Sequence, residues 1–175
     1  MIGGISQYFP TVYVEDVFSI DYQNLYDSGI RGVIFDIDNT LVPHGNDSTP
    51  QVDNLFKTIH SIGLKTLLLS NNSEERIMRF NKKIDTLYIC DAGKPSVSAF
   101  YNALEKLKMK RMEVVVIGDQ VFSDICGANH CGIKSILVKY IGFHDKGWKG
   151  YKRILESIIL WLFRLKSRKN NDINY

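Results

Sequence analysis

The stretch GVIFDIDNTL at residues 32–41 places an apolar run directly before two aspartates. An apolar run without alternation is typical of a strand that is covered on both faces, as in a parallel sheet. Similar runs occur at 65–70 (KTLLLS) and 113–117 (EVVVI), with shorter ones at 135–138 (SILV) and near 87–90. We therefore predict that these five segments form a buried sheet.

Helical patterns lie between the predicted strands. Apolar residues recur at helical spacing in segments 50–61, 72–83, 96–107 and 121–131. Asn72 and Glu75 stand in capping-box positions at the start of the second segment. Strands that alternate with helices predict an α/β fold with a doubly wound, mostly parallel, Rossmann-like sheet. In such sheets ligands bind beyond the carboxyl ends of the strands, so reactive residues should follow each strand.

Length and composition indicate one globular domain. The chain has 175 residues, 45% hydrophobic and 23% charged, which suits a single domain with its own core. Residues 1–7 lack the features of a signal peptide, and no run of about 18 apolar residues occurs. Cys90, Cys126 and Cys131 show no metal-ligand spacing, so we expect reduced thiols in a cytoplasmic protein. A disulfide or metal site at Cys126 and Cys131 is the alternative.

Acidic, hydroxyl and basic residues follow the predicted strands in a definite order. They are Asp36 and Asp38 after the first strand, then Ser70, Asn71 and Asn72, then Lys94, then Asp119 and Asp124. Two carboxylates two residues apart repel each other unless a cation or a difference in protonation separates them. Each piece alone is a weak signal, but the order of all four predicts a phosphoryl-transfer site with Mg²⁺ and one lysine as its positive charges.

The segments DIDNTL, SNN, KP and GDQVFSD resemble the four ordered motifs of the haloacid dehalogenase (HAD) superfamily. They are most similar to its IIIA-type, YqeG-like branch, which is related to phosphatidylglycerophosphate phosphatases. The opening FPTVYVEDVFSIDYQNLYDSGIRG resembles the lead-in of that branch, so the similarity spans most of residues 8–140. The resemblance implies a HAD fold and a Mg²⁺-dependent phosphatase.

The resemblance also implies the catalytic and metal-binding residues. Asp36 would be the nucleophile and a Mg²⁺ ligand. Asp38 would be the general acid and base, with its backbone carbonyl on the metal. Asp119 would ligate Mg²⁺, and Asp124 would bind or orient the ion, directly or through water.

Ser70, Asn71 and Lys94 are the phosphate-binding residues that the resemblance implies. Ser70 would hold the phosphoryl group with help from Asn71, and Lys94 would neutralise the intermediate. His44 departs from the branch, which often has a large aromatic residue after the proline at 43, so the substrate contacts there stay open.

The same residues have structural explanations. The aspartates of the first motif could cap a turn, and residues 70–72 could cap a helix, which is the only role we expect for Asn72. Taken alone, Lys94 would be a solvated lysine and Asp124 a structural acid at a helix start. The order of the motifs favours catalysis. Surface or packing roles are expected for His44, His60, His130 and His144.

Segment 146–169 combines an apolar stripe with basic flanks. Its eight Lys and Arg residues against Glu156 give a surplus of seven charges in a chain of net charge +3, which leaves the remainder at −4. Such a helix suits the surface of an anionic membrane, with Trp161 near the headgroups. Alternatively, 154–165 packs on the sheet or in a dimer interface. Nucleic acid is not an expected partner, since no base-stacking motif is evident.

The spacing of the motifs leaves no room for a sizeable cap domain. Only 31 residues separate Asp38 from Ser70, and 23 separate Ser70 from Lys94. An open site suits a phosphate that is presented on a lipid bilayer or a protein. We divide the chain into a HAD core with its lead-in (1–145), the basic amphipathic helix (146–169) and a tail (170–175).

Three functions follow as hypotheses. The first is a Mg²⁺-dependent phosphomonoesterase with an aspartyl-phosphate intermediate, acting on phosphatidylglycerophosphate or a similar large or lipid-borne ester. The second is a phosphatase of a nucleotide, sugar phosphate or phosphoprotein. The third is a partner-docking module on a HAD frame. The expected location is the cytoplasm or the inner face of a membrane, and the sequence does not predict the oligomeric state.

Overall fold

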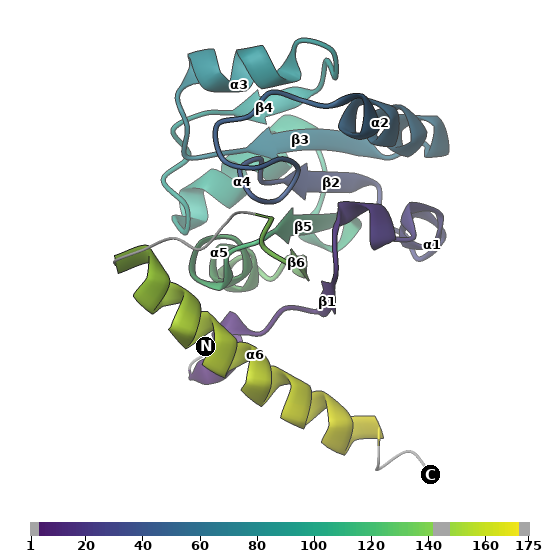
Figure 1. Cartoon of the computed structure of the whole chain (residues 1–175). Coiled ribbons are helices and arrows are strands. Elements are labelled where there is room, and N and C mark those ends of the chain that lie inside the picture. Colours follow the sequence, from purple (N-terminus) through teal and green to yellow (C-terminus); the bar gives the residue numbers. More distant parts are fainter. Residues whose placement is uncertain (1–3, 142–147, 172–175) are drawn as a thin grey trace.

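The computed structural model describes residues 4–141 and 148–171, and within the last helix the side chains of 154–166. The described residues form one sheet of six strands, all parallel, in the order β1-β6-β5-β2-β3-β4 (Figure 1). The strands are β1 (Val12–Val14), β2 (Gly32–Phe35), β3 (Lys65–Leu69), β4 (Leu87–Ile89), β5 (Val114–Gly118) and β6 (Lys134–Val138). The predicted parallel sheet is confirmed.

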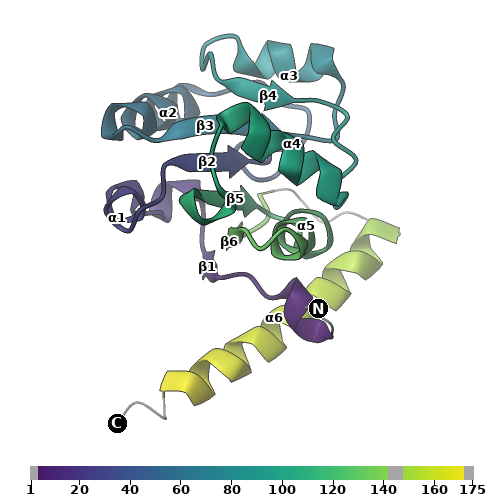
Figure 2. The same cartoon turned by 180° about the vertical axis from the view of Figure 1, so that it is seen from behind.

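Helices cover both faces of this sheet (Figures 1 and 2). One face carries α1 (Tyr22–Asp27), α2 (Pro50–Ile62) and α3 (Glu74–Asn81), and the other carries α4 (Val97–Leu107) and α5 (Cys126–His130). Since successive side chains of a strand point to opposite faces, Val33 and Phe35 of β2 join the first apolar layer and Ile34 joins the second. The fold is therefore doubly wound.

Local signals fix the path between the central strands. The Thr49 side chain accepts a hydrogen bond from the Val52 N–H, and Pro50 occupies the first turn of α2, where its missing N–H costs nothing. Gly63 ends the helix with φ 100°, a left-handed conformation that glycine adopts without strain. The chain then enters β3 directly.

Three features differ from the prediction. β1 was not predicted, because it is only three residues long and lies half-exposed at the sheet edge. The N-cap of α3 is Ser73, so the capping box predicted for Asn72 and Glu75 is wrong. The helix predicted for 121–131 is divided into a π-helical turn (Val121–Ile125) and α5.

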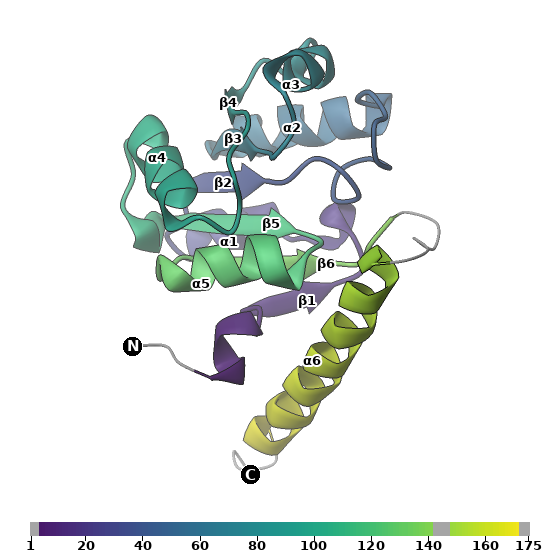
Figure 3. The same cartoon turned by 90° about the vertical axis from the view of Figure 1, so that its left-hand side faces the viewer.

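The last helix, α6 (Trp148–Asn171), runs along the β1 edge of the sheet beside the short 3-10 helix Ile5–Tyr8 (Figures 1 and 3). Ile159 is buried in a cluster with Val121, Ile125 and Leu137. The predicted packing of this segment is thus present on one face of the helix. Its opposite face is exposed and apolar, as described below.

No cap domain stands over the carboxyl edge in the described part of the chain: a loop and α2 lie between β2 and β3, and α3 between β3 and β4. All three cysteines are free, so a Cys126–Cys131 disulfide is absent. Across the described ranges, no helix is both long and apolar enough to traverse a bilayer. His144, Lys146 and residues 172–175 of the predicted tail lie outside the described residues.

Candidate active site

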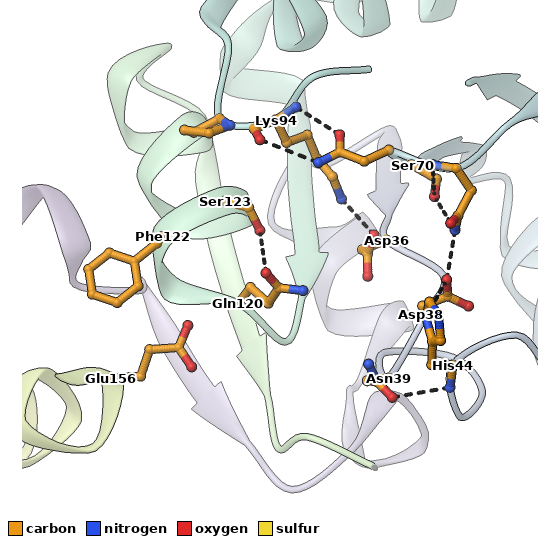
Figure 4. A pocket seen from close by; sticks show the side chains of 13 residues that line it. Asp36, Asp38, Asn39, His44, Ser70, Lys94, Gln120, Phe122, Ser123 and Glu156 are labelled. Atoms are coloured by element: carbon orange, nitrogen blue, oxygen red, sulfur yellow. Dashed lines mark hydrogen bonds and ion pairs between the residues drawn. The ribbon is translucent and has the colours of Figure 1, made fainter. Parts of the chain in front are cut away.

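A pocket of about 350 Å³ lies at the carboxyl edge of the sheet, and the predicted residues Asp36, Asp38, Ser70, Asn71 and Lys94 all line it (Figure 4). They come from the ends of β2 and β3 and from the loop that precedes α4. Parallel strands bring their carboxyl ends to one edge, which explains why residues that are distant in the sequence meet here.

Three predicted acids lie together beside this pocket. Asp36, Asp119 and Asp124 are buried, and one carboxylate oxygen from each lies within 4.8 Å of the others. The Thr40 hydroxyl lies 3.2 Å from Asp36 Oδ2 and 3.3 Å from Asp119 Oδ1, so it can donate its hydrogen bond to either carboxylate. Buried carboxylates at this spacing are suited to a hard divalent cation such as Mg²⁺. The carboxylate of Asp38 is not in this group, and the predicted metal contact of its backbone carbonyl stays a prediction.

Gly118 and the π-helical turn bring Asp124 back to this cluster. A Cβ at Gly118 would lie 2.4 Å from Asp124 Cγ, a distance that no real side chain tolerates. The Gln120 N–H donates to Asp124 Oδ2 at 3.1 Å. The glycine and the turn together explain the GDxxxxD spacing, because they seat the second acid of the motif against the end of β5.

Lys94 is buried between two of the acids. Its Nζ donates to Asp36 Oδ1 at 2.6 Å and to Asp124 Oδ1 at 2.7 Å, and only 4% of its side chain is exposed. Burial alone would lower the pKa of Lys94, but the charges of Asp124 and Asp36 outweigh it and raise that pKa. Burial raises the pKa of Asp36 to about 6, against the attraction of Lys94. The lysine therefore stays protonated and offsets the negative charge of the site.

Ser70 and Asn71 occupy different positions in the pocket. Ser70 Oγ accepts hydrogen bonds from the backbone and side-chain amides of Asn72, at 3.2 and 2.9 Å, which directs the proton of its hydroxyl elsewhere. The Asn71 side chain exchanges hydrogen bonds with the backbone of Lys94, at 2.8 and 3.4 Å. Asn71 thus fixes the backbone of the loop that carries Lys94. The predicted phosphate contacts of Ser70 and Asn71 stay predictions.

Asp38 is surrounded by hydrogen-bond donors. Its carboxylate accepts from Asn72 Nδ2 at 2.7 Å, from the Gly45 N–H at 3.1 Å and from Arg76 at 3.0 Å. His44 Nδ1 lies 3.1 Å away. Burial alone would raise the pKa of Asp38, but the bonds from Asn72 and Gly45 and the Arg76 charge outweigh it and lower that pKa. The resting carboxylate is therefore ionised and ready to accept a proton.

The chain is similar to known proteins over most of its length. It is 32% identical over 160 residues to a Bacillus subtilis protein named "Probable phosphatase YqeG", covering 91% of this chain and 93% of the relative. A HAD-hydrolase-like family model matches residues 91–154.

The chain belongs to the HAD-like hydrolases, in the YqeG branch.

Solved structures agree with the HAD fold. A haloacid dehalogenase-like hydrolase from Brucella suis superposes with a TM-score of 0.51 at 11% identity, over 70% of this chain and 93% of that one. An uncharacterized protein from Listeria monocytogenes gives a TM-score of 0.56 at 22% identity, over 67% and 84%. At these identities the likeness concerns the fold alone.

Several residues of the HAD site were not predicted from the sequence. Asn72 was assigned a capping role only, yet its amide bridges Asp38 and Ser70. Arg76 was not singled out, because a basic residue on a helix gives no distinct signal. Gln120, inside the fourth motif, and Glu156, on α6, line the pocket as well. Their contribution depends on packing between distant segments, which no local pattern reveals.

Replacing Arg76 by Met is expected to destabilise this HAD protein by about 1–2 kcal/mol at neutral pH, a value reduced for solvent screening of the Asp38 pair. Only 11% of the Arg76 side chain is exposed, and it holds both Asp38 and the Asn46 carbonyl. The folded state lowers the pKa of Asp38. The ionised Asp38 therefore contributes its full stabilisation of the fold above the ordinary carboxyl pKa, and this contribution is lost as the pH falls through the pKa of Asp38 in the folded protein.

Urea unfolding at neutral pH and near roughly pH 2 checks this linkage, since the difference between wild type and Arg76→Met should be smaller at the acid end, where the bond to the Asn46 carbonyl remains but the Asp38 pair is weakened. Arg79→Met is the matched control on the same helix, because its ion pair with Asp47 is more than half exposed. An Arg76→Met effect of equal size at both pH values would contradict the assignment.

Proposed function

We propose that this chain is a Mg²⁺-dependent phosphomonoesterase that forms a phosphoryl ester on Asp36 and acts on a lipid-borne substrate such as phosphatidylglycerophosphate. The enzyme class, a HAD-type phosphatase, follows from family membership and the name of the relative in Bacillus subtilis. One observation carries the chemistry: Lys94 lies between two acids of the three-carboxylate cluster beside the pocket. That arrangement suits a phosphate dianion together with a divalent cation.

The residues divide the reaction into two displacements. A carboxylate oxygen of Asp36 attacks phosphorus, and the bond from phosphorus to the alcohol oxygen breaks while Asp38 protonates that oxygen. Water then attacks the aspartyl-phosphate, Asp38 takes its proton, and Asp36 is released with inorganic phosphate. Asp36, Asp119 and Asp124 would hold the cation, which when bound supplies positive charge to the phosphoryl oxygens. Ser70 and Lys94 donate to the same oxygens.

The proton on Asp38 needs an explanation, because its surroundings favour the carboxylate. The arriving phosphate ester brings its own negative charge into the pocket, and like charges raise a carboxyl pKa. His44, with 68% of its side chain exposed, lies at the pocket mouth and within hydrogen-bond distance of Asp38. It is a route by which a proton from solvent reaches the acid.

The lipid substrate is supported by the outer face of α6. Ile154, Ile158, Trp161 and Leu165 recur at helical spacing and are all exposed, Ile154 and Trp161 by 60%. Soluble proteins rarely leave such a stripe uncovered. An exposed apolar stripe on a basic helix suits the headgroup region of an anionic bilayer. The same helix lines the pocket through Glu156, so the proposed membrane face and the active site share one element.

Purified protein with Mg²⁺ is expected to hydrolyse phosphatidylglycerophosphate in mixed micelles, and the double change Ile158→Ser with Trp161→Ser should lower that rate by about tenfold or more, since each apolar side chain loses its burial in lipid. Flotation with anionic vesicles should fall in parallel, while hydrolysis of p-nitrophenyl phosphate should stay close to wild type.

Met112→Ser is the matched control, because Met112 is exposed by 78% and precedes the amino end of β5, whereas the pocket lies at the carboxyl ends of the strands. Efficient hydrolysis of soluble esters together with no activity on the micellar lipid would reject the lipid substrate. A substrate panel would then identify the nucleotide, sugar phosphate or phosphoprotein of the second hypothesis. Absence of hydrolysis throughout would favour the docking module.

A further inference from the structure

The turn that carries Asp124 has to be held in place for the three-carboxylate cluster to form. Asp124 lies in the π-helical turn Val121–Ile125, and its carboxylate is one of the three that lie together. The same carboxylate accepts a hydrogen bond from Lys94 Nζ at 2.7 Å. Whatever fixes this turn therefore affects both the proposed cation site and the lysine.

The start of this turn is capped by a residue that is distant in the sequence. The first N–H groups of a helix have no acceptor within the helix, and the N-cap residue Gln120 makes no side-chain cap hydrogen bond. The Val121 N–H donates instead to Oε1 of Glu156 on α6, at 3.0 Å and 35 positions away. Both residues are buried, so an N–H that lost this acceptor would be left without a partner, at a cost in free energy.

Apolar contacts hold α6 against the same turn. Ile159, one helical turn beyond Glu156, is buried in a cluster with Val121 and Ile125. Figure 4 shows Glu156 extending from α6 toward the turn that carries Gln120. Apolar burial is non-directional, so the hydrogen bond from Val121 to Glu156 is the contact that fixes the backbone of the turn at one point along α6.

We propose that Glu156 is a positioning residue for the cation site: by accepting from the Val121 N–H, it holds the turn where Asp124 completes the three-carboxylate cluster. The role requires an acceptor oxygen at this position. The inference rests on the cation site of the proposed function and extends it, because the affinity of that site then depends on α6.

Glu156→Gln and Glu156→Met separate the hydrogen bond from the charge, because both remove the charge and only the amide keeps an acceptor oxygen. Calorimetric titration of the full chain with Mg²⁺, without substrate, should give a Kd about tenfold weaker for Glu156→Met than for Glu156→Gln, as expected when a buried N–H loses its acceptor. Glu105→Gln and Glu105→Met, at an exposed position on α4, should bind Mg²⁺ equally well.

Val121→Pro removes the donor of the same hydrogen bond. Gln120 has an extended backbone with ψ 119°, which is compatible with a following proline, and the first position of a helix tolerates proline. In the Val121→Pro background, the Gln and Met variants of Glu156 should bind Mg²⁺ equally well, since the bond that distinguishes them is gone.

Equal Mg²⁺ affinity of Glu156→Gln and Glu156→Met in the otherwise wild-type chain would overturn the positioning role, whether or not Val121→Pro folds. A tenfold difference that persists in the Val121→Pro background would overturn it as well. Wild type that binds no Mg²⁺ would remove the cation site and this inference with it. The expected difference in Mg²⁺ affinity, without phosphate release from any ester, would reject the phosphatase function and support the positioning role.

Discussion

Replacing Asp36 by Asn is expected to reduce phosphate release by about 10⁴-fold or more on every substrate, as is usual when a catalytic nucleophile is removed. The amide that replaces the carboxylate cannot form the aspartyl ester, and it weakens the three-carboxylate cluster. Single-turnover measurements of phosphate release, with mass spectrometry of acid-quenched protein, would detect the phosphorylated residue in wild type and its absence in the variant.

Asp85→Asn is the matched control for this change. Asp85 is exposed, precedes β4 at the other edge of the sheet, and has φ 51°, a conformation that Asn tolerates as well as Asp. The control should retain wild-type activity. Asp36→Asn with more than a tenth of the wild-type rate would show that another group attacks phosphorus, and the proposed mechanism would be wrong.

The change Lys94→Met is expected to destabilise the Mg²⁺-free protein by about 3–5 kcal/mol, the usual cost of removing one partner from a buried ion pair. Asp36, Asp119 and Asp124 would then share a buried site without the lysine between them. Mg²⁺ should restore much of this loss, so it should raise the unfolding midpoint further in the variant than in wild type.

Activity should nevertheless stay about a thousandfold below wild type with Mg²⁺ present, because the charge on the phosphoryl group is no longer neutralised by a fixed donor. Thermal unfolding in chelator and in Mg²⁺, beside initial rates, separates the two effects. Lys57→Met, at an exposed position on α2, is the control. Equal stability of Lys94→Met and wild type in chelator would contradict the charge-balancing role.

The central part of the fold was predictable because strong local signals coincide there. The apolar runs that became β2, β3 and β5 are fully buried or nearly so, and each is followed by residues of one motif. The edge strand β1 gave no such signal. It is only three residues long, and its ladder partner β6 lies more than a hundred residues away in the sequence.

The candidate site was predictable only as far as its motifs reach. The order of the acids brought Asp36, Asp119 and Asp124 together in the prediction as in the fold. Asn72 was predicted to cap a helix because asparagine is a common N-cap residue. In the fold its side chain donates to Asp38 instead, a contact between residues far apart in the sequence. Glu156 could not be predicted from the sequence, because it reaches the pocket only through the packing of α6 on the turn after β5.

The missing side chain of Gly118 sets a limit on how this chain can vary. A methyl group at Gly118 would overlap the side chain of Asp124. Asp124 can therefore keep its position only while residue 118 has no side chain. Homologous chains that have lost the glycine should also have lost the acid or lengthened the intervening turn. A comparison of these two positions, and of the length of the turn between them, across homologous chains would check this coupling.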